Sequence, residues 1–305
     1  MADHSIPATR GAMATSLDCL PCFVRQALAA ARMATPDPGV QETIVREVLK
    51  LIDRTDLSLT PAFLAQRFHR RIRDIVGSRD PYREAKDRQN ALALSFVRDL
   101  RAEIESSADP LLTAARLAVA GNVIDLGAPG DVSRNRVRTA VEQALSEPLR
   151  NEGDGLREAL VSARKILYLA DNAGEIAFDR LFVEQLGPNR VTVAVRGGPV
   201  INDATIEDAR AVGLDEIVEV IDNGSDAPGT LLDDCGPEFQ RRFAEADLIL
   251  AKGQGNYETL GRHPSDIIFL FAVKCPVIAG LSGAPVGSHV WLRPLGEEAH
   301  SEARP

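Results

Sequence analysis

The sequence predicts an α/β fold, in which a mostly parallel sheet covered by helices follows an N-terminal domain made of helices alone. Two observations support this prediction. Apolar residues recur at helical spacing through the first half of the chain, and in the second half short β-rich runs alternate with helices. A polar stretch at 151–155 separates the two patterns. We therefore predict a helical domain at 1–150, with residues 1–15 disordered, an α/β domain at 151–295 and a flexible tail at 296–305.

The helical half is divided by clear breaks. Proline and glycine accumulate between the periodic segments, and proline stands near the first turn of several of them, where its missing N–H costs nothing. The predicted helices span 17–32, 40–53, 61–76, 82–105, 110–119 and 132–145.

The second half has the βαβ rhythm of a parallel sheet. The predicted strands span 165–170, 191–195, 216–221, 248–251, 267–271 and 276–279. Helices are predicted at 175–185, 203–212 and 237–245.

The composition is that of a globular protein, with 45% hydrophobic residues, 26% charged residues and a net charge of −9. Non-specific binding to nucleic acid or to an anionic membrane needs a basic face, so we expect neither partner. No apolar run approaches the roughly 20 residues that span a bilayer, and the N-terminus lacks the apolar segment of a secretory signal. We expect a cytoplasmic protein, and the sequence does not indicate its oligomeric state.

The first predicted strand is followed by Asp171-Asn172-Ala173-Gly174-Glu175. Ligands of open α/β sheets bind beyond the carboxyl ends of the strands, and carboxylate and amide oxygens are hard ligands for Mg²⁺, Mn²⁺ and similar ions. Gly174 allows a close backbone approach. The alternative interpretation is an ordinary helix N-cap, because Asp and Asn both cap well.

The second predicted strand is followed by a segment from Arg196 to Thr205. The guanidinium of Arg196 matches phosphate oxygens, and Asp203 could supply a second metal carboxylate. The alternatives are a surface ion pair for Arg196 and a helix cap for Asn202 and Asp203.

The strand at 248–251 is followed by Lys252-Gly253-Gln254-Gly255-Asn256. Backbone N–H groups of such a glycine-rich segment could surround an anion, with Lys252 as a point charge for a phosphoryl group. The alternative is a tight turn. Because the carboxyl ends of parallel strands share one edge, the three segments together predict a metal and phosphate site there.

These residues resemble a known family, the metal-dependent damage-control phosphatases, formerly a domain of unknown function numbered 89. The C-x-x-C of Cys19 and Cys22 resembles the stand-alone branch found in archaea and bacteria. The matching motifs are L-D-C-L-P-C (17–22), D-P-Y-x-x-x-K (80–86) with Asn90, A-G-N-x-I-D (120–125), D-N-A-G-E (171–175), R-G-x-P-x-I-N-D-A-T (196–205), A-K-G-Q-G-N-Y-E (251–258) and K-C-P-V-I-A (274–279).

The resemblance implies a helical domain beside a Rossmann-like α/β domain, with the active site between them. It implies one divalent cation (Mn, Mg, Co or Ni) on Asp171, Asn172 and Asp203, and hydrolysis of sugar phosphates or other small, often damaged, phosphorylated metabolites. With these three residues we predict a catalytic role for Lys252. The predicted substrate-binding residues are Asn122, Asp125, Glu175, Arg196, Asn202, Gly253 and Asn256. We expect the segment 80–90 to contribute to substrate choice.

Several alternatives stay open at this point. The nucleophile is either water activated by the ion or a carboxylate that forms an acyl-phosphate, and we favour water. A carboxyl methyltransferase and a non-enzymatic metal- or redox-sensing metabolite-binding protein are the competing functions. Cys19 and Cys22 form half of a tetrahedral zinc site, which Cys275, with Cys235 or a histidine, could complete. Their alternatives are two helix cysteines without a metal or a redox pair.

Overall fold

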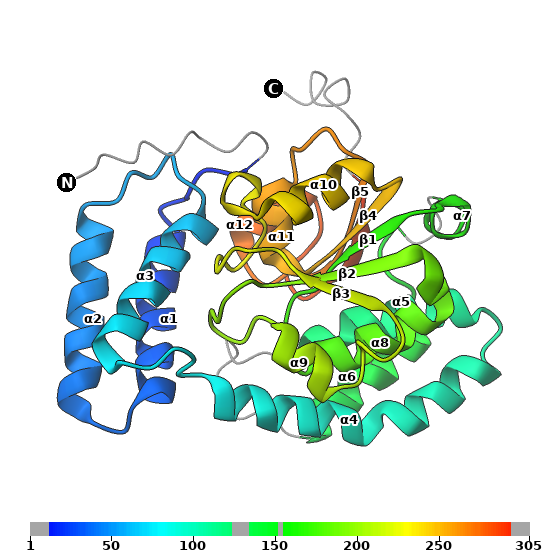
Figure 1. Cartoon of the computed structure of the whole chain (residues 1–305), viewed down its shortest axis with the longest axis horizontal. Coiled ribbons are helices and arrows are strands. Elements are labelled where there is room, and N and C mark those ends of the chain that lie inside the picture. The colour runs from blue at the N-terminus through cyan, green and yellow to red at the C-terminus, as the bar shows by residue number, and fades with distance from the viewer. Residues whose placement is uncertain (1–11, 124–133, 152–154, 294–305) are drawn as a thin grey trace.

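The computed structural model describes residues 12–123, 134–151 and 155–293, and all structural statements refer to them. Helices α1 (Cys19–Ala34), α2 (Pro38–Asp53) and α3 (Pro61–Val76) pack on one another as a bundle. Its core includes Phe23 and Phe68, whose rings meet edge to face at 5.1 Å. The bundle lies beyond the carboxyl ends of the central strands (Figure 1).

The sheet has six strands within the described residues, in the order β3-β2-β1-β4-β5-β6. Neighbours pair in parallel except β6, which runs antiparallel to β5. This is a Rossmann-like order, in which the direction of sheet growth reverses between β1 and β4, and ligands of open α/β sheets bind beyond the carboxyl ends of the strands at such a point. The strands are β1 (Ile166–Leu169), β2 (Val191–Val195), β3 (Glu219–Asp222), β4 (Leu248–Lys252), β5 (Ile267–Ala272) and β6 (His289–Leu292).

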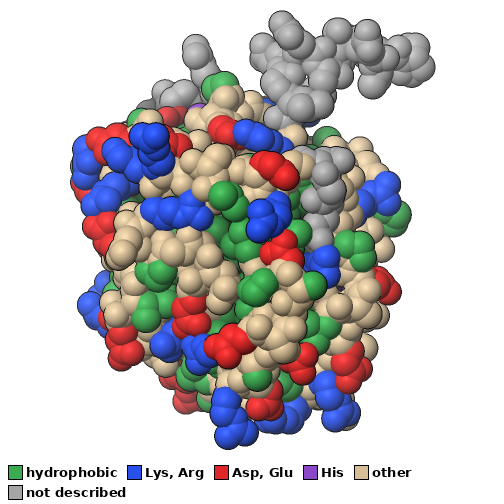
Figure 2. Space-filling view, turned by 90° about the vertical axis from the view of Figure 1, so that its right-hand side faces the viewer, with side chains coloured by type: hydrophobic (Ala, Val, Ile, Leu, Met, Phe, Trp, Pro, Cys, Tyr) green, Lys and Arg blue, Asp and Glu red, His purple; other side chains and the backbone are tan. Residues whose placement is uncertain are grey.

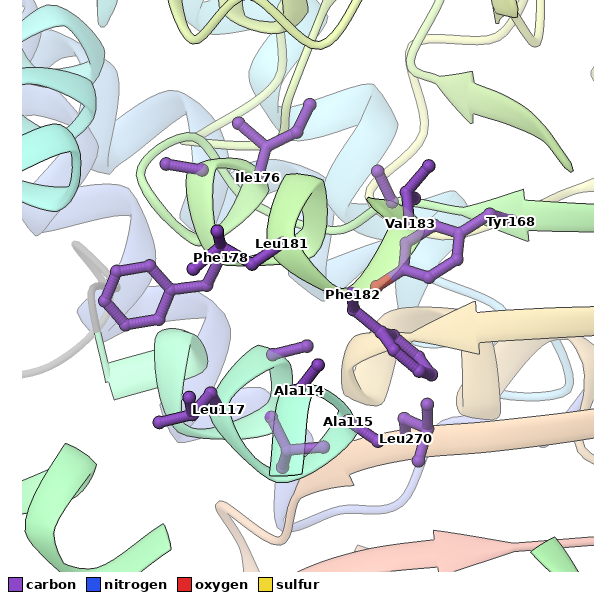
Figure 3. Packing of buried hydrophobic residues seen from close by; sticks show 14 of the residues in the cluster. Ala114, Ala115, Leu117, Tyr168, Ile176, Phe178, Leu181, Phe182, Val183 and Leu270 are labelled. Atoms are coloured by element: carbon purple, nitrogen blue, oxygen red, sulfur yellow. The ribbon is translucent and has the colours of Figure 1, made fainter. Parts of the chain in front are cut away.

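One face of the sheet is covered by helices from both halves of the chain (Figure 1). Figure 3 shows Phe182 of α8 pointing toward Leu270 of β5, with Ala114 and Ala115 of α5 close by. The helices of this face are α4 (Arg83–Ser106), α5 (Pro110–Ala120), α6 (Arg134–Ser146), α7 (Leu156–Ser162), α8 (Glu175–Leu186) and α9 (Ile206–Ala211).

The other face is covered by α10 (Pro237–Glu245), α11 (Gly253–Leu260) and α12 (Pro276–Ser282). Single 3₁₀ turns at Gly121–Val123, Pro188–Arg190 and Leu232–Asp234 complete the described elements. No described helix is long and apolar enough to cross a membrane.

The hydrophobic cores change between α3 and α4 rather than at residue 150. Helices α4, α5 and α6 share one buried cluster with the sheet, whereas α1 to α3 enclose their own. The predicted boundary at 150 therefore follows the change of secondary structure and not the packing. The predicted tail at 296–305 lies outside the described residues.

The strand predicted at 276–279 was wrong, because this segment is the first part of α12. Its β-branched Val277 and Ile278 favour a strand, but Pro276 occupies the first helical turn and Ile278 is buried against the sheet. The short elements α7, α11 and β6 were not predicted.

Candidate metal-binding active site

The two segments that follow β1 and β2 are joined by their main chains. Asn172 and Asp203 form an antiparallel β-bridge. The N–H of Ala204 donates to the carbonyl of Asp171, and that of Ala173 to the carbonyl of Asn202, both at 2.8 Å. The predicted ligands Asp171, Asn172 and Asp203 therefore lie side by side at the carboxyl edge of the sheet. All three are buried.

None of these residues serves as a helix cap. Helix α8 begins at Glu175 after Gly174, without a side-chain capping bond. Helix α9 begins at Ile206, and its cap is Thr205. The capping interpretation of Asp171, Asn172 and Asp203 is thus wrong, and so is the expectation that Asp203 opens the helix.

Glu175 is fully buried and extends the carboxylate cluster. Its Oε2 accepts hydrogen bonds from the amides of Asn122 at 2.7 Å and Asn172 at 3.1 Å. The same two amides donate to Oδ2 of Asp171, at 3.1 and 2.6 Å. Asp171 and Glu175 therefore share two neutral hydrogen-bond donors, the amides of Asn122 and Asn172.

This crowding of negative charge changes the protonation of Asp171. Burial, followed by the charges of Glu175 and Asp203, raises the pKa of Asp171 well above its ordinary value. The charges of Lys274 and Arg196 offset the rise only in part. A divalent cation at this position would relieve the repulsion.

Arg196 forms a buried ion pair rather than a surface one. Its Nε donates to Oδ2 of Asp203 at 2.7 Å, and its side chain is 2% exposed. Its Nη1 lies 3.4 Å from Oδ1 of Asn256. Its Nη2 has no hydrogen-bond partner among the described residues and lies 3.9 Å from Oδ1 of Asp171. One edge of the guanidinium thus remains available to an anion at the site.

Lys252 has three partners and is fully buried. Its ammonium lies 2.6 Å from Glu175 Oε1, 2.6 Å from Asp179 Oδ1 and 3.0 Å from the carbonyl of Ala118. Burial favours the neutral amine, but Asp179 and Glu175 together raise the pKa of Lys252. Contact of Lys252 with a phosphoryl group stays a prediction, and it requires the ammonium to leave one of these partners.

The glycine-rich segment after β4 is a helix start and not a tight turn. Gly253 begins α11 with φ of +79°, and a Cβ atom on it would lie 2.0 Å from Oδ2 of Asp171. Asn256 lies in the first turn, where its Nδ2 donates to the carbonyl of Lys252 at 2.7 Å. Gly253 therefore allows the carboxylate of Asp171 to sit directly against the backbone.

The chemistry of the donor set fits a hard divalent cation. Carboxylates of Asp171 and Asp203 and the amide of Asn172 are oxygen ligands. In addition, Oδ1 of Asn122 is buried without a hydrogen-bond partner among the described residues. Those residues contain no group of three His, Cys, Asp or Glu side chains placed to hold an ion, so an ion here depends on amide oxygen as well.

Comparison with known proteins decides the family. The model of the damage-control phosphatase ARMT1-like domain matches residues 15–290. The chain belongs to this family.

Relatives and a solved structure agree with the assignment. The chain is 37% identical to a damage-control phosphatase of Archaeoglobus fulgidus, over 89% of this chain and 96% of the relative. It is 36% identical to an uncharacterised protein of Methanocaldococcus jannaschii, over 90% and 94% of the two chains. The crystal structure of a Pyrococcus horikoshii protein, described as a DUF89 family protein, has 31% identity and a TM-score of 0.82, and covers 92% of this chain and 99% of that one. The same P. horikoshii protein is named a damage-control phosphatase, so the relatives support a phosphatase.

Lys274 is a residue of this ARMT1-like chain to which we assigned no role from the sequence. It follows β5, its side chain is exposed, and its charge opposes the rise in the pKa of Asp171. Lys274 is therefore near enough for its charge to act on Asp171. A lysine just after a predicted strand was the available signal, because the other site residues occupy the same kind of position.

The contacts described above do not define a role for two of the predicted site residues. Asp125 lies outside the described residues. Asn202 is buried next to Asp203, and its Nδ2 has no hydrogen-bond partner among the described residues.

The cysteines do not form a three-ligand group within the described part of the chain. Cys19 and Cys22 lie in the first turn of α1, and Cys235 is buried in the core under the sheet. Burial raises the pKa of the Cys19 thiol, with smaller contributions from Glu258 and Cys275. This shift disfavours a thiolate, and the structural zinc stays a prediction.

One hollow of the described surface lies away from the predicted site. It has a volume of about 560 Å³ and is found at the amino ends of β1 to β3, lined among others by Ile166, Val191, Glu219 and Arg242. Figure 2 faces this edge, where basic and acidic side chains surround apolar ones. None of the predicted site residues lines this hollow.

Proposed function

We propose that this chain is a divalent-metal-dependent phosphatase that hydrolyses small phosphorylated metabolites. The observation that carries the proposal is the β-bridge between Asn172 and Asp203, which brings two carboxylates and an amide together beside Nη2 of Arg196, an atom without a hydrogen-bond partner among the described residues. Hard oxygen ligands next to a guanidinium suit a metal ion and a phosphate group together.

The ion, one of Mn²⁺, Mg²⁺, Co²⁺ and Ni²⁺, would be held by Asp171, Asn172 and Asp203. When bound, such an ion neutralises charge on the phosphoryl oxygens and acidifies water. Asn122 and Glu175 orient the amide of Asn172 and the carboxylate of Asp171 through their shared hydrogen bonds. Coordination by Asn172 requires its amide oxygen, because the nitrogen already faces the two carboxylates.

The phosphoryl group would be bound by the cationic side of the site. Arg196 offers Nη2, and the exposed residue Lys274, which follows β5, supplies a second cation. Lys252 is better placed to balance the charges of Glu175 and Asp179 beneath the site than to meet the substrate first. Asn256 and Gly253 would shape the base of the substrate-binding site.

Water is the nucleophile that the contacts favour. Oδ2 of Asp171 accepts two amide hydrogen bonds and lies against Gly253, so this carboxylate is held in place by its surroundings. Glu175 is held by Lys252 and by the same amides. A carboxylate with these partners is poorly placed to attack phosphorus.

The substrate class follows from the relatives and remains part of the proposal. Two relatives are named damage-control phosphatases, which favours damaged or reactive phosphorylated metabolites as substrates. The carboxyl methyltransferase and the non-enzymatic sensor gain no support from the site, because the segment after β1 carries ligand-type carboxylates where a methyl donor would need a glycine-rich loop.

The first test is hydrolysis of p-nitrophenyl phosphate by the purified protein with Mn²⁺, Co²⁺, Ni²⁺ or Mg²⁺, with and without EDTA. We expect activity that EDTA abolishes. Asp203→Asn keeps the size of the side chain and should reduce turnover by at least about 100-fold, because a preorganised electrostatic contact is lost. Asp215→Asn, at a half-exposed carboxylate on the loop before β3, is the matched control and should leave turnover unchanged. Full activity in EDTA, or in folded Asp203→Asn, would contradict the proposal.

A further inference from the structure

A second cluster of buried charges lies next to the metal site. Asp208 of α9 is fully buried, and two cations of α4 contact it: Lys86 Nζ at 2.6 Å from Oδ2 and Arg83 Nη2 at 2.5 Å from Oδ1. Lys86 is itself fully buried. The segment 80–90, which we expected to contribute to substrate choice, thus directs these two side chains toward Asp208.

One arm of this cluster reaches the segment that carries Asp171 and Asn172. Nδ2 of Asn90 donates to Oδ1 of Asp208 at 2.9 Å, which fixes the orientation of the Asn90 amide. Oδ1 of Asn90 then accepts the backbone N–H of Gly174 at 2.7 Å. Asn90 is 2% exposed, so water cannot readily replace either hydrogen bond. Loss of one of them would leave a buried polar group without a partner, which is costly.

Gly174 has an unusual backbone conformation. Its φ and ψ are 77° and −59°, close to a γ-turn form that residues with a Cβ atom rarely adopt and that glycine allows. Because glycine can also adopt many other conformations, its neighbours must select this one. The turn comes two residues after Asn172, so the bond from Asn90 acts on the part of the loop that aims the metal ligands.

The other arm reaches the segment that carries Asp203. The backbone N–H and the hydroxyl of Thr205 both donate to Oδ2 of Asp208, at 2.9 and 2.8 Å. Thr205 comes two residues after Asp203. A single carboxylate therefore contacts the loop of one predicted ligand directly and the loop of the other two through Asn90.

We propose that Asn90 is a positioning residue of the metal site: by bridging Gly174 and Asp208, it fixes the loop of Asp171 and Asn172 relative to the loop of Asp203. This inference rests on the metal site of the proposed function. Asn90 contacts neither the ion nor the substrate in this arrangement. Its effect is on the spacing and direction of the ligands.

The test compares Asn90→Ala with Arg88→Ala, a change on the same helix at a side chain that is 71% exposed. Free Mn²⁺ is measured by electron paramagnetic resonance during titration, and hydrogen exchange is followed at the Gly174 amide without metal. Asn90→Ala should bind Mn²⁺ about 10- to 100-fold more weakly, as is typical when a partner behind a metal ligand is lost. Exchange at Gly174 should become faster. Saturating Mn²⁺ should restore much of kcat, and Arg88→Ala should match the wild type in every measurement.

Asn90→Asp is the second variant if Asn90→Ala does not fold. It keeps an acceptor for Gly174 but places a carboxylate against Asp208, so Mn²⁺ affinity should still fall. Wild-type Mn²⁺ affinity in a folded variant overturns the inference, whether or not exchange at Gly174 changes. A wild type that binds Mn²⁺ but hydrolyses no phosphate ester sinks the proposed function alone. A wild type that binds no divalent ion overturns both.

Discussion

At the scale of single residues, the site depends on one position where no side chain fits. The carboxylate of Asp171 occupies the space that a Cβ atom on Gly253 would need. The positive φ of Gly253 is also a conformation that other residues adopt only with strain. Glycine at 253 therefore leaves room for Asp171 at the end of the neighbouring strand β1 and also allows the backbone to start α11.

Gly253→Ala should displace Asp171 and weaken Mn²⁺ binding by at least about tenfold, with a parallel loss of phosphatase activity. Isothermal titration with Mn²⁺ measures the first effect. Gly280→Ala is the matched control, since Gly280 lies in α12 with no atom within 4 Å of the new methyl group. That change should leave Mn²⁺ binding intact and stabilise the helix by about 0.5–1 kcal/mol. Equal Mn²⁺ affinities in the two variants would contradict the role of Gly253.

At the scale of elements, helix α3 is fastened to the loops that enclose the site. Asp226, on the loop after β3, accepts hydrogen bonds from Gln66 at 2.7 Å and from Arg70 at 2.5 Å. Arg73 of the same helix contacts both Asp226 and the carbonyl of Pro199, which lies between Arg196 and Asp203. The bundle thus contacts the loops that follow β2 and β3 through polar and charged side chains.

Asp226→Ala should lower the free energy of unfolding by about 2 kcal/mol, since hydrogen bonds to a charged, partly buried group are lost. Hydrogen exchange should become faster in α3 and in the loop 197–202. Glu238→Ala removes an exposed carboxylate whose partners are Arg241 and Arg242 of the same helix, α10, and it should leave the free energy of unfolding nearly unchanged. Urea unfolding measures the free energy of unfolding of each variant. Identical values for the two variants would show that the contacts of Asp226 with α3 do not stabilise the fold.

At the scale of the whole molecule, the candidate metal site concentrates negative charge inside a protein that is already acidic. The net charge is −9, and three buried carboxylates meet where β1 and β2 end. In the metal-free protein the raised pKa of Asp171 means that its contribution to stability is complete at low pH and is lost as the pH rises through that pKa. An ion requires the deprotonated carboxylate and removes this loss.

The melting temperature difference between Mn²⁺-loaded and EDTA-treated protein should therefore be larger at pH 8 than at pH 5. Free Mn²⁺ at one hundred times its Kd should stabilise the fold by about 2.7 kcal/mol. Calorimetry of both forms at each pH gives the difference, in which groups remote from the site cancel. Asp203→Asn should abolish it. A difference that is constant between the two pH values would mean that Asp171 does not titrate against the ion.

The sequence was sufficient for elements whose signals are local. Proline in the first turn and a clear apolar stripe place α3 (Pro61–Val76) and α10 (Pro237–Glu245) at the predicted bounds, and the β-branched run Val191–Val195 is β2 as predicted. The proximity of Asp171, Asn172 and Asp203 was predicted because parallel strands end at one edge of the sheet, and their role as metal ligands stays a prediction.

The remaining features depend on contacts between residues distant in sequence. Lys252 was expected to meet phosphate, but Asp179 and Ala118, 73 and 134 residues away, help to surround it. Asp203 pairs with Asn172 through the main chain, which no side-chain pattern reveals. The segment 276–282 carries β-branched residues that favour a strand, whereas Pro276 in the first turn and the burial of Ile278 against the sheet accompany the helix that it forms.

The bridge between Asn172 and Asp203 has a consequence for how this enzyme class can diversify. Main-chain atoms are common to all amino acids, so these bonds do not themselves require a particular side chain at either segment. Residues beside the bridge can therefore change in the course of evolution while the main-chain bonds that bring Asp171, Asn172 and Asp203 together are kept.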